Sequence, residues 1–161
     1  MITLKQIQVK PSEGLKRTLD EMILLENISI EKQAFVSWVF KNFSSDCAGC
    51  LPGKVWSYMI DNFKYQDDVS DEVLIAPHVM IQLKAGDCDD FALFAKTIID
   101  VIGGFYTHYL LLGKKRFKFT HIVVFVHRGK MNNSFVDPVI VDGMNNDFNL
   151  IDLKYNFYKI I

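Results

Sequence analysis

The sequence predicts an α+β domain in which an antiparallel sheet packs against helices. Apolar residues in the first two thirds of the chain recur mostly at helical spacing, whereas short β-branched and aromatic runs separated by turn-like segments follow from residue 105 onward. The length of 161 residues fits one domain, and the 50% hydrophobic content is enough for a full core. We expect a single domain over 1–161, with an arm at 1–12, a core at about 13–145 and a tail at 146–161.

The N-terminal part predicts an arm followed by two helices. Residues 1–12 alternate in polarity and predict an arm or edge strand. Residues 13–28 carry apolar side chains at helical spacing and predict a helix. A second helix is expected to open at Ser29 or Glu31 and to continue to residue 43.

The middle of the chain contains weaker signals. The segment SSDCAGCLPGK (44–54) is rich in turn-forming residues and predicts a loop. Residues 55–65 fit a short helix or a strand, and 66–72 form a polar loop. The apolar stretch 73–83 is interrupted by Pro77, which predicts a bend and a short helical turn.

A helix is expected to begin at Cys88 and to end at the Gly103–Gly104 pair. Three β-branched and aromatic runs then predict strands, at 105–112, 119–127 and 134–143. The amphipathic C-terminal segment 150–161 fits a last strand, a helix or a surface that binds a partner.

The stretch KAGDCDDFALF places a cysteine in the first turn of a helix. Asp87 is a good N-cap, and Asp90 follows three residues later, as in a capping box. The positive end of the helix dipole and the free N–H groups there favour the Cys88 thiolate and can receive an oxyanion. Three acids, which include Asp89, oppose the thiolate, so we expect Cys88 to depend on a separate base.

A histidine and an aspartate on the following strands fit the two other roles of a thiol enzyme. His121 opens an apolar strand, where a polar imidazole has no packing role, and is the candidate base. Asp137, in FVDPV on the next strand, is the candidate for orienting the imidazole. Asp142 in VDG is the alternative, because it also lies at a strand end.

The stretches GDCDDFALF, THIVVFV and VDPV resemble the transglutaminase-like superfamily of papain-like thiol enzymes. The upstream segment NFKYQDDVSDEVLIAPHVMIQLKAGDCDD is similar to the transglutaminase-like proteins of bacteriophages and prophages, and the likeness covers roughly residues 30–145. The resemblance implies a papain-like core and a triad of Cys88, His121 and Asp137. In relatives the second oxyanion donor is an upstream side chain, for which Tyr65 and Gln82 are the candidates here.

We therefore expect a phage-encoded cysteine hydrolase or transferase that acts on peptide or carboxamide bonds through a thioester. The alternative is a catalytically silent structural or assembly component of a phage particle that binds partners through its arm and its YNFYKII tail. A third hypothesis is a zinc-binding domain built on Cys47 and Cys50; otherwise these are loop cysteines, a functional thiol pair or an occasional disulfide.

Composition limits the partners and the location. The net charge of −1 gives no electrostatic reason to expect nucleic acid binding, and no apolar run approaches the roughly 20 residues that span a membrane. The N-terminus lacks the apolar region of a signal peptide, and three cysteines argue against a disulfide framework. We expect a peptide or protein substrate, no cofactor or metal, contacts with phage structural proteins, and a location in the bacterial or phage-infected cytoplasm or the virion.

Overall fold

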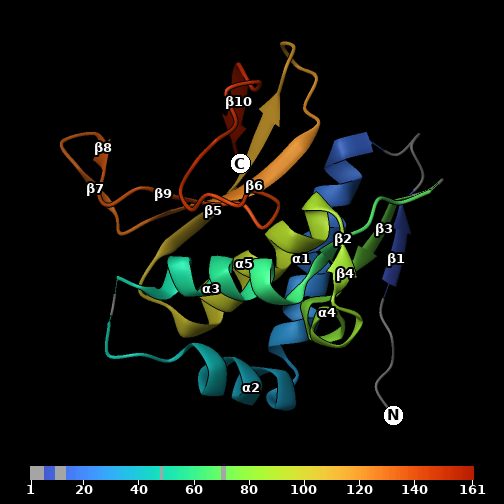
Figure 1. The fold of residues 1–161 in the computed structure, drawn as a ribbon, viewed down its shortest axis with the longest axis vertical. Helices are drawn as coiled ribbons and strands as arrows, with labels where there is room; N and C mark the ends of the chain where they lie inside the picture. The colour runs from blue at the N-terminus through green and yellow to red at the C-terminus, as the bar shows by residue number, and fades with distance from the viewer. Residues whose placement is uncertain (1–5, 10–13, 48, 70–71) are drawn as a thin grey trace.

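The computed structural model describes residues 6–9, 14–47, 49–69 and 72–161. The described residues form five helices: α1 (Gly14–Ile30), α2 (Gln33–Phe43), α3 (Leu51–Asn62), α4 (Pro77–Leu83) and α5 (Cys88–Ile102). They also form the strands β1 (Gln6–Val9), β2 (Lys64–Tyr65), β3 (Glu72–Ile75), β4 (Ala85–Gly86), β5 (Tyr106–Gly113), β6 (His121–His127), β7 (Lys130–Met131), β8 (Ser134–Phe135), β9 (Val139–Val141) and β10 (Phe157–Ile160). The α+β prediction is confirmed (Figure 1).

The main sheet has the strand order β10-β5-β6-β9, and all its pairs are antiparallel. The β5–β6 pairing is the longest and runs from Tyr106 opposite His127 to Leu112 opposite His121. The C-terminal segment supplies the edge strand β10. Of the strand, helix or partner surface expected for 150–161, the structure has the strand.

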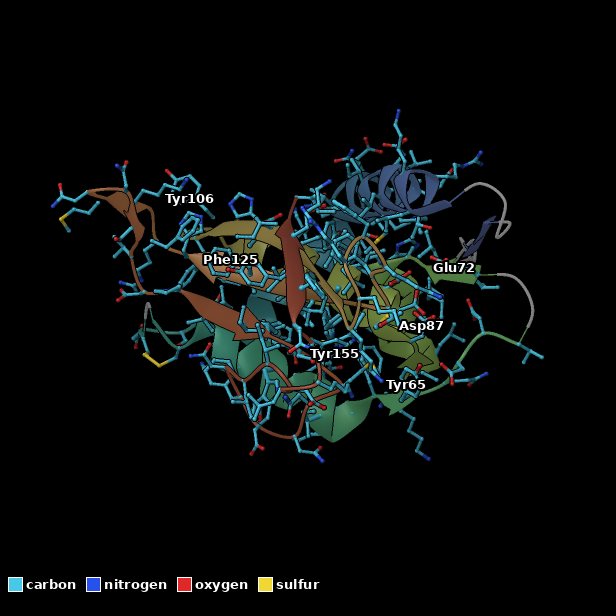
Figure 2. The ribbon with its side chains drawn as sticks, turned by 90° about the horizontal axis from the view of Figure 1, so that it is seen from above. Tyr65, Glu72, Asp87, Tyr106, Phe125 and Tyr155 are labelled. Carbon is cyan, nitrogen blue, oxygen red and sulfur yellow. A yellow bond between two sulfur atoms is a disulfide. The ribbon has the colours of Figure 1, made fainter. Side chains whose placement is uncertain are left out.

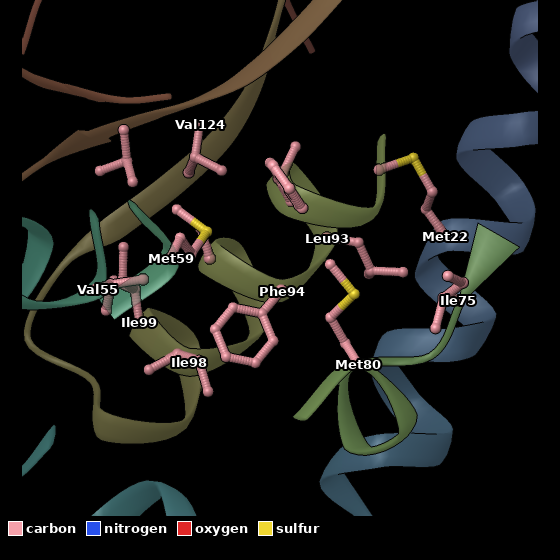
Figure 3. Close-up of a cluster of buried hydrophobic side chains, with 14 of the residues drawn as sticks. Met22, Val55, Met59, Ile75, Met80, Leu93, Phe94, Ile98, Ile99 and Val124 are labelled. Carbon is pink, nitrogen blue, oxygen red and sulfur yellow. The ribbon is translucent and has the colours of Figure 1, made fainter. Parts of the chain in front are cut away.

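Helix α5 is the centre of the core. Its residues are apolar around most of its circumference, which is typical of a helix that is covered on all sides. It packs against the inner face of β5 and β6 and is surrounded by the other four helices (Figure 1). Figure 3 shows Phe94 of α5 among buried side chains from distant segments, including Met59 of α3 and Met80 of α4.

Two boundaries in the N-terminal half differ from the sequence prediction. Ser29 lies inside α1 rather than at a helix start, because its hydroxyl donates to the carbonyl of Leu25 (2.9 Å) and lies 2.9 Å from Nδ1 of His78. Helix α3 begins at Leu51, within the predicted loop 44–54, because Pro52 is tolerated in a first helical turn.

Short pairings on the other side of α5 hold the segment that leads to Cys88. Strand β1, part of the predicted arm, pairs with β3, and β2 pairs in parallel with β4. The rest of the predicted arm at 1–5 and 10–12 lies outside the described residues. Gly86 of β4 is required here, because a Cβ at this position would lie 2.6 Å from Oδ2 of Asp90.

Across the described ranges, every helix is too short or too polar to cross a membrane.

Candidate active site

Cys88 is the first residue of α5 and is held there by a complete capping box. The Asp87 carboxylate accepts from the backbone N–H of Asp89 at 3.1 Å, and Oδ2 of Asp90 accepts from the N–H of Asp87 at 3.2 Å. The other oxygen of Asp90 accepts from the N–H of Ile75 in β3 at 2.7 Å. The helix start predicted from the sequence is therefore tied to the neighbouring strand, and the thiol position is fixed by buried hydrogen bonds.

The environment of the thiol favours its protonated form. Burial raises the pKa of the Cys88 thiol well above its usual range, and the negative charges of Asp89 and Asp87 raise it further. The sulfur donates to Oδ1 of Asp89 at 3.3 Å. The backbone N–H of Ile122 acts in the opposite direction and lowers the same pKa. Burial and the two acids therefore favour the thiol over the thiolate.

The acids beside Cys88 have perturbed ionisation as well. Burial is the main cause that raises the pKa of Asp87 to about 6 and that of Asp90 to about 8. The pKa of Asp89 is raised by burial and then by a hydrogen bond with Glu72 of β3. A proton shared within this group reduces the negative charge that the thiol meets at neutral pH.

His121, the first residue of β6, is paired with an aspartate. Its Nε2 lies 2.8 Å from Oδ2 of Asp142, and both side chains are nearly buried, at 5% and 11% exposure. The ring of Tyr155 stacks on the imidazole, with centroids 5.5 Å apart and planes 17° from parallel. The imidazole is therefore fixed at one nitrogen and on one face, and Nδ1 remains for a second partner.

The thiol and the imidazole belong to neighbouring elements. The N–H of Ile122, which acts on the Cys88 sulfur, belongs to the residue directly after His121. Helix α5 packs against β6, and the contact of Ile122 with the sulfur places the start of the helix beside the start of the strand. The structure thus brings Cys88 and the His121–Asp142 pair to one place.

Asp137 lies elsewhere. It precedes β9 with a left-handed φ of 48°, its side chain is 69% exposed, and its carboxylate is 3.8 Å from Nε of Arg128. The register of the β6–β9 pairing explains the difference, because it places Val141 opposite Val124. Continued in both directions, this register places Asp142 near the His121 end of β6 and Asp137 opposite Arg128 at the far end.

Helix α3 supports the loop that carries Asp142. The indole N–H of Trp56 donates to the carbonyl of Asn145 at 2.9 Å. Gly143 packs so closely on Met59 that a Cβ would lie 3.1 Å from the sulfur of Met59. The carboxylate of Asp142 also accepts from the N–H of Met144 at 3.0 Å. These contacts, which sequence spacing does not reveal, set the position of the acid.

The two candidates for a second oxyanion donor differ in position. Tyr65 of β2 pairs with Gly86, two residues before the thiol, and the charges of Cys88 and Asp87 contribute to its raised pKa after a hydrogen bond to Asp67 and burial. Figure 2 shows Tyr65 and Asp87 on the same side of the molecule, with Tyr155 nearer its middle. Gln82 is exposed on α4. The structure therefore favours Tyr65 as the side chain nearer to Cys88.

Two groups bear on metal binding. In the portion of the chain that is described, Asp87, Cys88 and Asp89 form a group whose ligand atoms lie within 4.8 Å of one another. Carboxylate oxygens suit a hard cation and a sulfur suits a soft one, so the donor set is mixed. Cys47 and Cys50 are joined in a disulfide, so their sulfurs are not free to bind zinc in this state.

A hollow of about 630 Å³ adjoins the imidazole. It is bounded by His121 and Asp142 on one side and by the C-terminal segment from Leu150 to Tyr155 on the other. Because this hollow meets the His121–Asp142 pair, it is a candidate place for the part of a substrate that lies beyond the imidazole.

No family model and no curated protein matches this sequence. Two solved structures of Legionella pneumophila LapG, one of them EGTA-treated, have a similar fold, each with a TM-score of 0.52 and 19% identity. The match covers 79% of this chain and 75% or 73% of LapG. The chain therefore has a LapG-like α+β fold.

Proposed function

We propose that the protein is a cysteine hydrolase or transferase of the transglutaminase-like type, in which Cys88 is the nucleophile, His121 the general base and Asp142 the orienting acid. The observation that carries the proposal is the nearly buried 2.8 Å contact between His121 and Asp142, beside the start of α5. A cysteine at a helix N-terminus, a base and a residue that orients the base are the parts that nucleophilic catalysis by a thiol requires.

The geometry supports a definite sequence of proton transfers. Nδ1 of His121 takes the proton from the Cys88 sulfur as the sulfur attacks the carbonyl carbon. The backbone N–H groups at the start of α5 stabilise the oxyanion, and Tyr65 joins them when its hydroxyl turns away from Asp67. His121 then gives its proton to the leaving amine, and a thioester remains on Cys88. Water releases an acid from this thioester, whereas an amine forms a new amide.

The raised pKa of Cys88 assigns a specific role to His121. Burial and the neighbouring acids disfavour the thiolate, which supports proton transfer to His121 during the attack. General-base assistance of this kind contributes roughly 10²- to 10⁴-fold to a rate. Loss of His121 is therefore expected to reduce turnover nearly to background.

Two likenesses support the proposed substrate class. The sequence motifs resemble transglutaminase-like thiol enzymes, including those of bacteriophages and prophages, and the fold is similar to that of LapG, a cysteine protease of the transglutaminase-like type. Both favour a peptide or protein substrate. The bacteriophage origin rests on the sequence resemblance alone, and with it the proposed contacts with other phage proteins.

A catalytically silent scaffold is the second candidate function. The observation that favours it is the hydrogen bond from the Cys88 sulfur to Asp89, because a protonated thiol that is held by a carboxylate is a poor nucleophile. In that case the acids around the thiol cap α5 and serve the fold only, and the tail that forms β10 is available to bind partners.

An activated ester separates the two candidates without knowledge of the substrate. p-Nitrophenyl acetate should acylate Cys88, with release of p-nitrophenolate and a mass increase of one acetyl group that a Cys88→Ala variant lacks. A His121→Ala variant should lose this acylation by roughly 10²-fold or more. Equal rates in the protein and both variants would establish the silent scaffold.

The fate of the thioester then distinguishes hydrolysis from transfer. Addition of a primary amine such as methylamine should shift the product from acetate to N-methylacetamide if the site is a transferase. Unchanged acetate release at high amine concentration would assign hydrolysis. Incubation with a defined peptide library, read by mass spectrometry, then identifies the bonds that are cleaved or cross-linked.

A further inference from the structure

The turn before α3 carries a disulfide that the proposed function does not use. Cys47 and Cys50 are bonded to each other, and both residues are exposed to solvent. An exposed disulfide is open to attack by an external thiolate, unlike one that is buried in a core. The accessible pair is the first of three features that point to a chemical role.

The two sulfurs differ in their surroundings. Cys47 borders a hollow of about 420 Å³, whose wall includes Ser45, Phe105 and Arg128. Cys50 does not border this hollow and is instead the N-cap of α3, a helix of 12 residues. An incoming thiolate that occupies the hollow therefore meets the Cys47 sulfur, and Cys50 becomes the leaving group.

The leaving group is placed where a thiolate is stabilised. As N-cap of α3, Cys50 lies at the positive end of the helix dipole, and its sulfur makes no hydrogen bond to the first turn. Such placement lowers the pKa of a cysteine, and a leaving thiol with a low pKa departs faster. The arrangement thus favours attack at Cys47 over attack at Cys50.

A cation lies beside the pair. A Cβ added to Gly49 would lie 3.2 Å from Nη2 of Arg128, so the guanidinium adjoins the turn between the two cysteines. The same side chain covers the ring of Phe105, at 5.4 Å from its centroid. Nε of Arg128 lies 3.8 Å from the exposed carboxylate of Asp137, and Nη2 is the nitrogen next to the turn. Because a guanidinium has several N–H donors for carboxylates, the hollow suits a thiol that carries a carboxylate.

We infer that Cys47–Cys50 is a thiol–disulfide exchange site for small thiols that carry carboxylates, a role that is independent of the Cys88 site. A substrate thiolate attacks the Cys47 sulfur, forms a mixed disulfide with it and releases Cys50 as a thiolate. A second substrate thiolate attacks the substrate sulfur of the mixed disulfide and releases Cys47 as a thiolate. The pair gains two electrons, and two substrate thiols become one disulfide. The reverse reaction re-forms the bond.

Glutathione is the probe for the test, and uncharged 2-mercaptoethanol is its matched control. The full chain with Cys88→Ser is treated with each thiol at equal thiolate concentration, then quenched with N-ethylmaleimide and mapped by peptide mass spectrometry. We expect glutathione on Cys47 and maleimide on Cys50 in the trapped intermediate. Arg128→Gln should slow the glutathione reaction about threefold to fivefold, the range of one exposed ion pair, and leave 2-mercaptoethanol unchanged.

Lys130→Gln serves as the control variant, because Lys130 is another exposed cation of the same region but lies over Phe135. It should leave both rates within about twofold, below the effect of one exposed ion pair. Trapped glutathione on Cys50, or equal slowing by the two charge variants, would overturn the assignment. So would free thiols at both positions in the air-oxidised protein. None of these outcomes depends on acylation of Cys88, so failure of the exchange site would not count against catalysis at Cys88, or the reverse.

Discussion

Replacement of Asp142 by Asn, compared with the same change at Asp137, tests which carboxylate orients His121. The structure places Asp142 2.8 Å from Nε2 of His121, and it places Asp137 on Arg128 at the far end of β6. We expect Asp142→Asn to abolish most of the acylation of Cys88 and Asp137→Asn to leave it within about twofold, since an exposed ion pair contributes little.

The magnitude follows from the charge interaction. During attack the imidazole becomes a cation, and a carboxylate about 4 Å from that charge stabilises it by about 4 kcal/mol at an effective dielectric constant near 20. This corresponds to about 10³-fold in rate, because about 1.4 kcal/mol changes a rate tenfold. The low exposure of Asp142 (11%) limits solvent screening, whereas Asp137 is 69% exposed.

The assay is the release of p-nitrophenolate from p-nitrophenyl acetate, with the acetylated cysteine confirmed by mass. Circular dichroism and thermal unfolding of both variants verify that the fold is retained. If Asp137→Asn lowers the rate and Asp142→Asn does not, the imidazole has a different partner in the working enzyme, and the argument from strand register is wrong.

Further changes test the surroundings of the site. The pKa of Cys88 is raised by burial and then by the charge of Asp89, so Asp89→Asn should lower it. Alkylation by iodoacetamide near pH 8 should then be several-fold faster, and an unchanged rate would contradict this. Tyr155→Ala should slow acylation about threefold to tenfold by removing the ring stacked on His121, and Tyr155→Phe should not. Gly86→Ala should destabilise the fold by about 1–3 kcal/mol, measured by denaturant unfolding, because the added Cβ meets Asp90. Burial raises the pKa of Asp90 to about 8, so proton binding favours the folded state: Tm should fall as pH rises from about 4 to about 8, and Asp90→Asn should flatten that slope.

The fold could be predicted from the sequence in segments where one spacing of apolar residues dominates. The Cys88 helix, the strand that begins at His121 and the capping box at Asp87 and Asp90 follow from local residue types, and the structure has all of them. The first helix extends to Ile30, where Ser29 bonds back to Leu25 and also lies 2.9 Å from Nδ1 of His78, a neighbour that is distant in the sequence.

The candidate site was only partly predictable for a related reason. Cys88 and His121 are each marked by a local anomaly, an unusual helix start and a polar residue in an apolar strand. The choice between Asp137 and Asp142 depends on how β9 pairs with β6, and a register is set by turns and by packing rather than by the strand sequence. Tyr155 was missed because its role comes from the path of the tail, although the aromatic residues of this amphipathic segment were a signal.

Because the indole of Trp56 donates a hydrogen bond to the loop that carries Asp142, its fluorescence can report on the site. The chain contains two tryptophans, and Trp38 lies in a separate aromatic cluster with Phe43 and Tyr58. A Trp38→Phe variant would leave Trp56 as the sole indole emitter. Its emission would then report, in real time and without a substrate analogue, any displacement of the loop that holds Asp142 when a ligand enters the site.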